Sequence, residues 1–132
     1  MEVTKAGVDL GLLVRDVQAC LKFYCEDLGW PKVGVVEFPG GRRQHRVQVG
    51  DTLLKLMEFD EGAPPLGPRG RMAQAGIRYF TVTVRNLEGV MKDLEAKGHT
   101  FVLPLTKSPT GNMVCMVEDP EGNTVELLEP AP

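Results

Sequence analysis

The chain has 132 residues, 42% hydrophobic and 25% charged, and a formal net charge of −3. These values are typical of one globular domain with its own core, and an acidic balance without a basic run excludes nucleic acid and anionic membranes as expected partners. The chain also lacks the about 20 consecutive apolar residues of a membrane span, a signal-peptide pattern and paired cysteine spacing. We therefore expect a cytoplasmic protein with reduced cysteines.

In the first half of the chain, the patterns predict one strand, one helix and three further strands. The first strand is expected near residues 8–14. A helix is expected from Val17 to Leu28, with Asp16 as its N-cap and Gly29 after its end. The apolar stripe of this helix consists of Val17, Cys20, Leu21, Tyr24 and Leu28. The remaining strands are expected near residues 32–38, 44–49 and 52–59.

The second half repeats this layout after a connector from Asp60 to Gly76 that is rich in proline, glycine and alanine. A strand near residues 78–84 leads into a helix from Leu87 to Lys97, which lies between Asn86 and Gly98. Three strands follow, near residues 100–105, 113–118 and 124–129. The turn before the last strand reads Asp119-Pro120-Glu121-Gly122-Asn123.

The two halves are copies of one βαβββ unit. Asp9 stands at the position of Tyr79, and Lys55 stands at the position of Glu126. The sequence separation between corresponding residues of the two halves is nearly constant, which indicates a duplicated unit. We predict an α+β fold of one domain, with module one at about residues 6–60, the connector at about 60–76 and module two at about 77–130.

Strand alternation separates the residues under the helices from those on the opposite sheet face. Leu54, Leu56, Val125 and Leu127 are expected under the helices. The opposite face receives one residue from the first and one from the last strand of each module, namely Asp9, Lys55, Tyr79 and Glu126. These four side chains are therefore the candidate site.

A tight turn extends this candidate site to a neighbouring strand. If Gly50 and Asp51 form a two-residue hairpin turn, Arg46 lies opposite Lys55 and Gln48 lies opposite Leu53. Arg46 and Gln48 then share the face of the candidate site, and His45 lies on the helix side. A longer turn would reverse these assignments.

The chain resembles the vicinal oxygen chelate superfamily, which includes glyoxalases, bleomycin-resistance proteins and extradiol dioxygenases. The most specific motifs are the turn at Asp119–Asn123 leading into Val125-Glu126-Leu127, and Phe23-Tyr24 with Leu28-Gly29 at the end of the first helix. The resemblance covers nearly the whole chain. It implies two βαβββ modules whose mixed sheets curl into a cup, commonly completed in a homodimer.

In metal-using members, His, Gln and Glu ligands come from the positions that Asp9, Lys55, Tyr79 and Glu126 hold here. Only Glu126 keeps such a residue. A lysine ammonium group has no lone pair for a cation, and it would instead balance Asp9 and Glu126. We therefore expect no cofactor. The alternative is a divalent metal such as Mg²⁺ or Mn²⁺, held by Asp9, Tyr79 and Glu126 with Lys55 turned aside.

The preferred hypothesis is a metal-independent isomerase, epimerase, lyase or cyclising enzyme that acts on a small oxygenated organic molecule. Glu126 or Asp9 would act as general base, and Lys55 or Tyr79 would stabilise or protonate the resulting oxyanion. Substrate contacts are expected from Arg46, Gln48, Leu13, Met57, Thr81 and Leu128.

Three other interpretations remain open. The first is a non-catalytic protein that sequesters a small molecule, as bleomycin-resistance proteins do. The second is a glyoxalase-like divalent-metal enzyme. The third is that the ion pairs of Lys55 with Asp9 and Glu126 only stabilise the fold. For any one of these residues, this structural role explains its presence as well as a catalytic role does.

Overall fold

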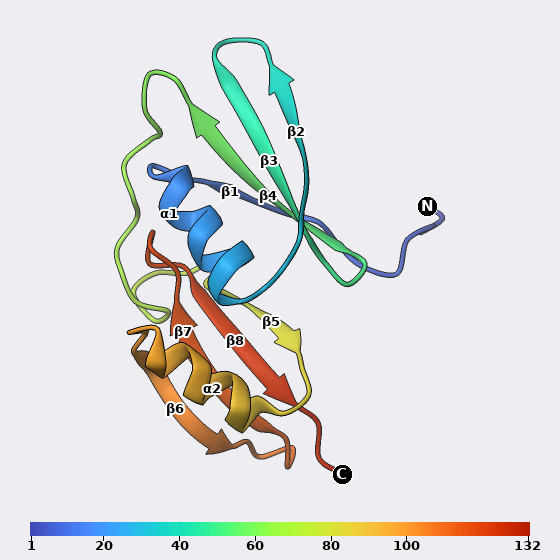
Figure 1. The fold of residues 1–132 in the computed structure, drawn as a ribbon. Helices are drawn as coiled ribbons and strands as arrows, with labels where there is room; N and C mark the ends of the chain where they lie inside the picture. Colours follow the sequence, from blue (N-terminus) through green and yellow to red (C-terminus); the bar gives the residue numbers. More distant parts are fainter. The chain divides into compact units, whose positions relative to one another are not determined.

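The computed structural model describes residues 1–132 as two compact units, Met1–Pro65 and Leu66–Pro132. Each unit contains a mixed four-stranded sheet with a helical segment on one face (Figure 1). The predicted α+β fold of two βαβββ modules is confirmed, because the order of elements and the order of strands are the same in both units.

The first unit follows the predicted order of elements. Strand β1 (Leu10–Leu13) leads into helix α1 (Val17–Leu21) and a π-helical turn, η1 (Lys22–Asp27). Three strands follow, β2 (Lys32–Phe38), β3 (Arg42–Val49) and β4 (Thr52–Phe59). The sheet order is β1-β4-β3-β2, in which β1 runs parallel to β4 and the other pairs are antiparallel.

The second unit repeats this topology. Strand β5 (Tyr79–Thr83) is followed by helix α2 (Leu87–Ala96), and then by β6 (Phe101–Lys107), β7 (Met113–Glu118) and β8 (Thr124–Glu129). The sheet order β5-β8-β7-β6 has the same parallel first pair as the first unit. The predicted connector, residues 60–76, contains turns and bends but no helix or strand.

The first helix differs from the prediction of one continuous α-helix. After Leu21 the backbone continues as a π-helical turn, in which the Leu28 N–H donates to the Phe23 carbonyl over 2.9 Å. A π-turn rotates the following side chains relative to α-helical spacing. As a result Phe23 and Tyr24 are both buried, whereas Leu21 and Leu28 are only half-buried. The predicted stripe is therefore buried at Val17, Cys20 and Tyr24, and it omitted the buried Phe23.

Each sheet has a buried face under its helix. In the first unit, α1 packs on β4, and the fully buried residues Val47, Leu54 and Leu56 lie on that side (Figure 1). In the second unit, α2 packs on β8, with Val125 and Leu127 beneath it. The predicted core face is confirmed in both modules. Burial of such side chains contributes about 1.5–3 kcal/mol each, so this face is the main source of stability.

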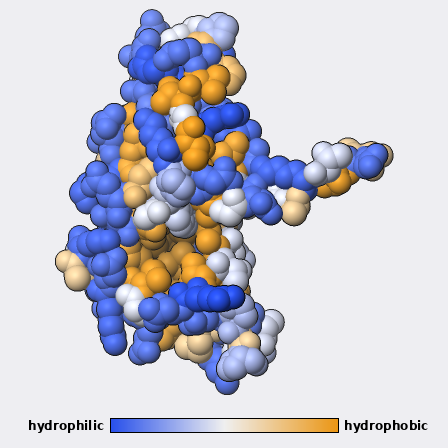
Figure 2. Space-filling view, turned by 45° about the vertical axis from the view of Figure 1, so that its right-hand side comes forward, coloured by the Kyte–Doolittle hydropathy of each residue, from blue (hydrophilic) through white to orange (hydrophobic).

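The surface seen in Figure 2 is mostly hydrophilic, with apolar patches between the polar regions. The exposed apolar residues of the chain include Leu13 and Tyr79, which are 54% and 50% exposed and were both predicted as site residues. No helix has the length and apolar composition needed to cross a membrane.

Candidate functional site

The face of the first sheet opposite α1 has the predicted register. Val49 pairs with Thr52 across Gly50 and Asp51, so the hairpin turn is the two-residue one. Arg46 consequently lies opposite Lys55, and Gln48 opposite Leu53. On the other side of β4, Leu13 pairs with Met57. The predicted residues of module one therefore share one open face of this sheet.

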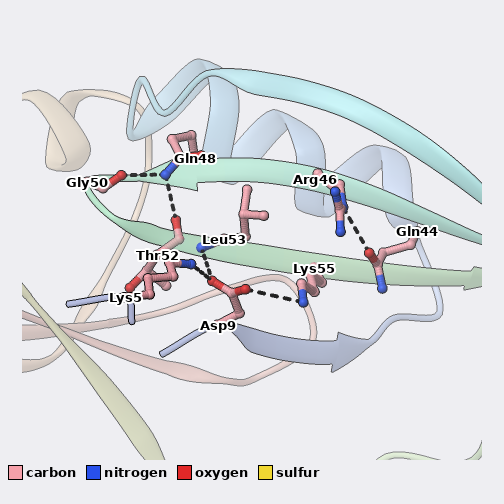
Figure 3. Close-up of polar contacts among 9 residues, drawn as sticks. All are labelled: Lys5, Asp9, Gln44, Arg46, Gln48, Gly50, Thr52, Leu53 and Lys55. Carbon is pink, nitrogen blue, oxygen red and sulfur yellow. Dashed lines mark hydrogen bonds and ion pairs between the residues drawn. The ribbon is translucent and has the colours of Figure 1, made fainter. Parts of the chain in front are cut away.

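Asp9 lies immediately before β1 and is held on both carboxylate oxygens (Figure 3). Its Oδ1 accepts a hydrogen bond from the Leu53 N–H over 2.8 Å and pairs with the Lys5 ammonium group. Its Oδ2 lies 3.3 Å from Lys55 Nζ. The Lys5 hydrogen bond, followed by the Leu53 N–H, holds the pKa of Asp9 well below its ordinary value of 3.8. Asp9 is therefore a permanent anion at neutral pH that fixes Lys55.

The polar side chains on β3 contact each other and the hairpin turn. Arg46 Nε donates to Gln44 Oε1 over 3.1 Å, and Gln48 Nε2 donates to the carbonyls of Gly50 and, over 3.3 Å, of Thr52 (Figure 3). The prediction missed Gln44, although alternation along β3 places it on the same face as Arg46 and Gln48. The open face of the first sheet thus presents two cations and two amides.

In the second sheet, Glu126 lies opposite Thr81 of β5 and opposite Met116 of β7. The Thr81 hydroxyl donates to Glu126 Oε1 over 2.7 Å. Tyr79 and Thr81 are two residues apart in β5, and strand side chains alternate with a period of two, so both lie on the same face. The structure therefore brings the predicted residues Tyr79, Thr81 and Glu126 onto one face, which also carries Leu128 opposite Thr83.

The turn before β8 fixes the start of the strand that carries Glu126. The buried Asp119 carboxylate accepts from the N–H groups of Glu121 and Asn123, over 2.9 and 2.8 Å, and from Asn123 Nδ2 over 2.9 Å. Gly122 takes a φ of 84°, which is strained for any residue with a Cβ. The sequence motif therefore has a structural role that places β8 and does not itself touch the candidate site.

His45 lies on the helix side of the first sheet, as the two-residue turn predicted. Its Nε2 is 2.8 Å from Glu58 Oε2, which also accepts from Arg43 Nε over 3.1 Å. His45 and then Arg43 lower the pKa of Glu58. Only 7% of His45 is exposed, so it belongs to the core of its module and not to the open face.

The residues at the family's ligand positions do not fit a divalent metal. In the first unit, both oxygens of Asp9 are already engaged by cations, and Lys55 occupies the position of a ligand. In the second unit, Glu126 has a hydroxyl and a thioether side chain as its cross-strand neighbours. Neither unit brings three or more His, Cys, Asp or Glu side chains together in a way that would hold a metal ion. A Ca²⁺, Mg²⁺ or Mn²⁺ site needs several such oxygen donors.

With the fold and this geometry established, comparison with known proteins identifies the family. The model of the Glyoxalase/Bleomycin resistance protein/Dioxygenase superfamily matches residues 8–127. The chain belongs to this superfamily. The match spans both βαβββ modules, so the family resemblance found in the sequence is confirmed. No curated protein matches the chain.

Solved structures of the superfamily share its fold. A glyoxalase family protein from Enterococcus faecalis is 24% identical over 97% of each chain, with a TM-score of 0.72. The antibiotic-binding protein TnmS3 from a Streptomyces species is 21% identical over 98% of this chain and 100% of its own, with a TM-score of 0.75. Lactoylglutathione lyase from Agrobacterium tumefaciens is 22% identical over 94% and 92%, with a TM-score of 0.67. At these identities the likeness concerns the fold alone.

Proposed function

We propose that this superfamily member is a metal-independent enzyme in which Glu126 acts as a general base on a small oxygenated organic molecule. The observation that carries the proposal is the asymmetric environment of the Glu126 carboxylate. One oxygen accepts from the Thr81 hydroxyl at 2.7 Å, while no protein donor is bonded to the other. A carboxylate fixed in this way can accept a proton from a substrate carbon beside a carbonyl group.

Glu126 is the better of the two predicted bases. The Asp9 carboxylate is bonded to Lys5, to the Leu53 N–H and to Lys55, which lower its pKa and occupy its lone pairs. A base with so low a pKa accepts protons poorly. We therefore assign Asp9 the role of positioning Lys55, and Thr81 the role of positioning Glu126.

Proton transfer to carbon or oxygen also requires an acid or an oxyanion-stabilising group. Tyr79 shares the sheet face of Glu126 and is half exposed, so its hydroxyl group is accessible to a ligand on that face. It is the donor we propose in module two. A contribution of Lys55 to the same substrate stays a prediction from the sequence.

The second candidate is a protein that sequesters a small molecule without turning it over. Two observations favour it. A solved structure of the same fold is an antibiotic-binding protein, and the open face of the first sheet carries the exposed apolar side chain of Leu13 beside Met57. Apolar contact with a few oriented polar groups is what a binding site requires.

Hydrogen–deuterium exchange at carbon separates the two functions. In D₂O, a general base of this kind exchanges the proton beside a carbonyl for deuterium, which NMR detects in a panel of hydroxy and keto acids. We expect Glu126→Gln to slow exchange by about 10²–10⁴-fold while ligand affinity stays unchanged. Thr81→Val should lower the rate and shift its pH profile, because Thr81 acts through Glu126.

The control for this experiment is Glu95→Gln, which removes one carboxylate from an exposed position of α2. It should exchange protons at the wild-type rate. If Glu126→Gln also exchanged at the wild-type rate, Glu126 would not be the base. If neither the wild type nor Glu126→Gln exchanged protons although both bound the ligand equally, sequestration would be the function.

We also propose a homodimer in a reducing cytoplasm. The family commonly completes its sites in dimers, and the cysteines form no disulfide within the chain. Sedimentation equilibrium would measure the mass of the assembly, and a monomer at micromolar concentration would contradict the dimer.

A further inference from the structure

One row of residues crosses the open face of the first sheet and has an unusual composition. Gly11 of β1 pairs with Lys55 of β4, Lys55 pairs with Arg46 of β3, and Arg46 pairs with Gly34 of β2. The row therefore reads Gly11, Lys55, Arg46, Gly34 across all four strands. Two cations lie side by side at its centre, and a glycine flanks each of them.

The central pair is electrostatically unfavourable by itself. Like charges placed directly opposite each other on neighbouring strands destabilise a sheet. Asp9 offsets part of this charge, but it is shared between Lys55 and Lys5. Arg46 has no carboxylate partner, and its guanidinium group contacts only the neutral amide of Gln44. The row thus carries excess positive charge on a face that a ligand can reach.

The flanking glycines leave open space beside the two cations. A Cβ atom added at Gly11 or at Gly34 would meet no other atom within 4 Å. Neither residue has a positive φ, so backbone conformation does not require glycine at either place. Glycine inside a strand weakens it and often marks either a β-bulge, such as the register shift between Lys32 and Gly34, or a site where a ligand approaches the backbone closely. Gly11 lies at no such bulge. Gly11 and the open space beside both glycines therefore point to a ligand lying over this row.

We propose that Arg46 and Lys55 form an oxyanion subsite that binds a carboxylate or phosphate group of the ligand over the Gly11–Gly34 row. This inference rests on the proposed function in one respect only, namely that the protein binds a small oxygenated ligand. The guanidinium fork of Arg46 binds two oxygens of such a group, and Lys55, held by Asp9, adds a point charge. Leu13 and Met57 lie one strand repeat further on the same face and contact the apolar part of the ligand.

Inorganic phosphate and acetate test this subsite without knowledge of the natural ligand. Each is titrated into ¹⁵N-labelled protein at constant ionic strength, and the amide resonances of Gly11 and Gly34 are followed by NMR. We expect saturable shifts at both glycines with at least one of the two anions, and none at Gly98 in the other module. Saturable shifts with phosphate alone, with acetate alone or with both anions show which class of oxyanion the subsite binds. Absence of saturation with both would overturn the proposal.

Matched substitutions show whether the two cations are responsible. Lys55→Met and Arg46→Gln should each weaken binding by about tenfold or more, as loss of one charge-assisted contact does. Lys92→Met and Arg85→Gln remove the same charges from exposed positions of module two and should leave binding unchanged. Lys55→Arg should retain it. Equal weakening by all four neutralising variants would contradict a subsite, since net charge alone would then explain the binding.

Gly34→Val provides a test that does not alter charge. Valine suits a strand, and the space at this position accommodates its side chain, so the variant should fold. It should nevertheless exclude the anion, because its side chain fills the space beside Arg46. Wild-type affinity in this variant would overturn the proposed position of the ligand.

The Glu126→Gln variant separates this proposal from the proposed enzyme activity. Glu126 belongs to the other module and is not one of the two cations of the subsite, so we expect phosphate or acetate to shift Gly11 and Gly34 as in the wild type. If Glu126→Gln leaves proton exchange intact, the proposed base is wrong and the anion titration still decides the subsite. If the titration fails while Glu126→Gln abolishes exchange, only the subsite is wrong.

Discussion

Asp9 and Glu126 are both carboxylates on open sheet faces, but their surroundings give them different roles. Asp9 has a donor or cation on each oxygen. Glu126 has one hydroxyl donor on a single oxygen. Strand alternation predicted the faces of both residues. It could not predict the Leu53 N–H or Lys5 as partners of Asp9, because Lys5 belongs to a segment without regular structure.

The low pKa of Asp9 predicts a pH-dependent contribution to stability. Because the pKa of the folded state lies below that of the unfolded state, the contribution is present above about pH 4 and is lost as the pH falls through the folded-state value. Asp9→Asn should therefore lower the free energy of unfolding at pH 7, and the difference from wild type should shrink in acid. Urea unfolding at a series of pH values measures this difference.

The control for Asp9 is Asp51→Asn, in the exposed hairpin turn. It should show no comparable trend with pH. High salt should also reduce the Asp9 effect, because the carboxylate and its cations are accessible to solvent. A difference between Asp9→Asn and wild type that stayed constant down to about pH 2 would show that the charge of Asp9 is not the cause.

At the scale of elements, the last residue of β8 stabilises the helix of its module. Glu129 accepts from the Asn86 N–H over 2.8 Å and from the Leu87 N–H over 3.1 Å, at the start of α2. These donors have no partner within the helix. Glu129→Ala should lower the free energy of unfolding by about 1–2 kcal/mol, as loss of a helix cap and its charge does.

Urea unfolding of Glu129→Ala is compared with that of Glu95→Ala, at an exposed position of the same helix. The control should stay within about 0.5 kcal/mol of wild type. Equal effects of the two substitutions would show that the capping contacts contribute nothing. In module one, helix α1 is capped differently. The side chain of Asp16, directly before the helix, accepts a hydrogen bond from the Ala19 N–H over 3.0 Å.

The turn before β8 is the second element that we expect to contribute measurably to the free energy of unfolding. Asp119→Ala removes three hydrogen bonds and leaves two backbone N–H groups of a buried turn without this acceptor. We expect a loss of about 2–3 kcal/mol in the free energy of unfolding. Asp119→Asn retains an acceptor for the backbone groups and should lose less. Equal losses in the two variants, measured by urea unfolding, would contradict this account of the turn.

Strands were predicted more accurately than the first helix, for a physical reason. β2, β4, β7 and β8 have the predicted bounds. Alternation constrains all four strands, and the turns at Gly50-Asp51 and Asp119–Asn123 also fix an end of β4, β7 and β8. The π-helical turn after Leu21 was missed, because apolar spacing in sequence assumes a constant helical pitch. Burial of Phe23 was missed for the same reason.

The open face of the first sheet was predicted only in part. The opposition of Arg46 and Lys55 followed from the hairpin turn and is confirmed. Alternation along the first strand placed Gly11 on this face, whereas Gly34 of β2 was not recognised as part of it, because an absent side chain leaves no pattern in hydrophobicity. Their significance depends on strand register, which aligns them with the two cations.

At the scale of the whole molecule, membership of the superfamily and the two βαβββ modules are established, whereas the chemistry of this chain is a proposal. A fold shared with both an antibiotic-binding protein and lactoylglutathione lyase does not determine function. We expect the side chains at the family's ligand positions to decide it. Here they place an ammonium group where other members have a metal ligand.

The central claim is that the protein acts without a metal, and elemental analysis of the purified protein tests it most directly. The sample is purified without chelator, analysed for divalent metals, and compared in the proton-exchange assay before and after treatment with EDTA. The account predicts substoichiometric metal and an exchange rate that EDTA does not change, because Lys55 and the cation-bound Asp9 leave too few free donors. One tightly bound metal per chain, with activity lost on chelation and restored by that metal, would contradict it.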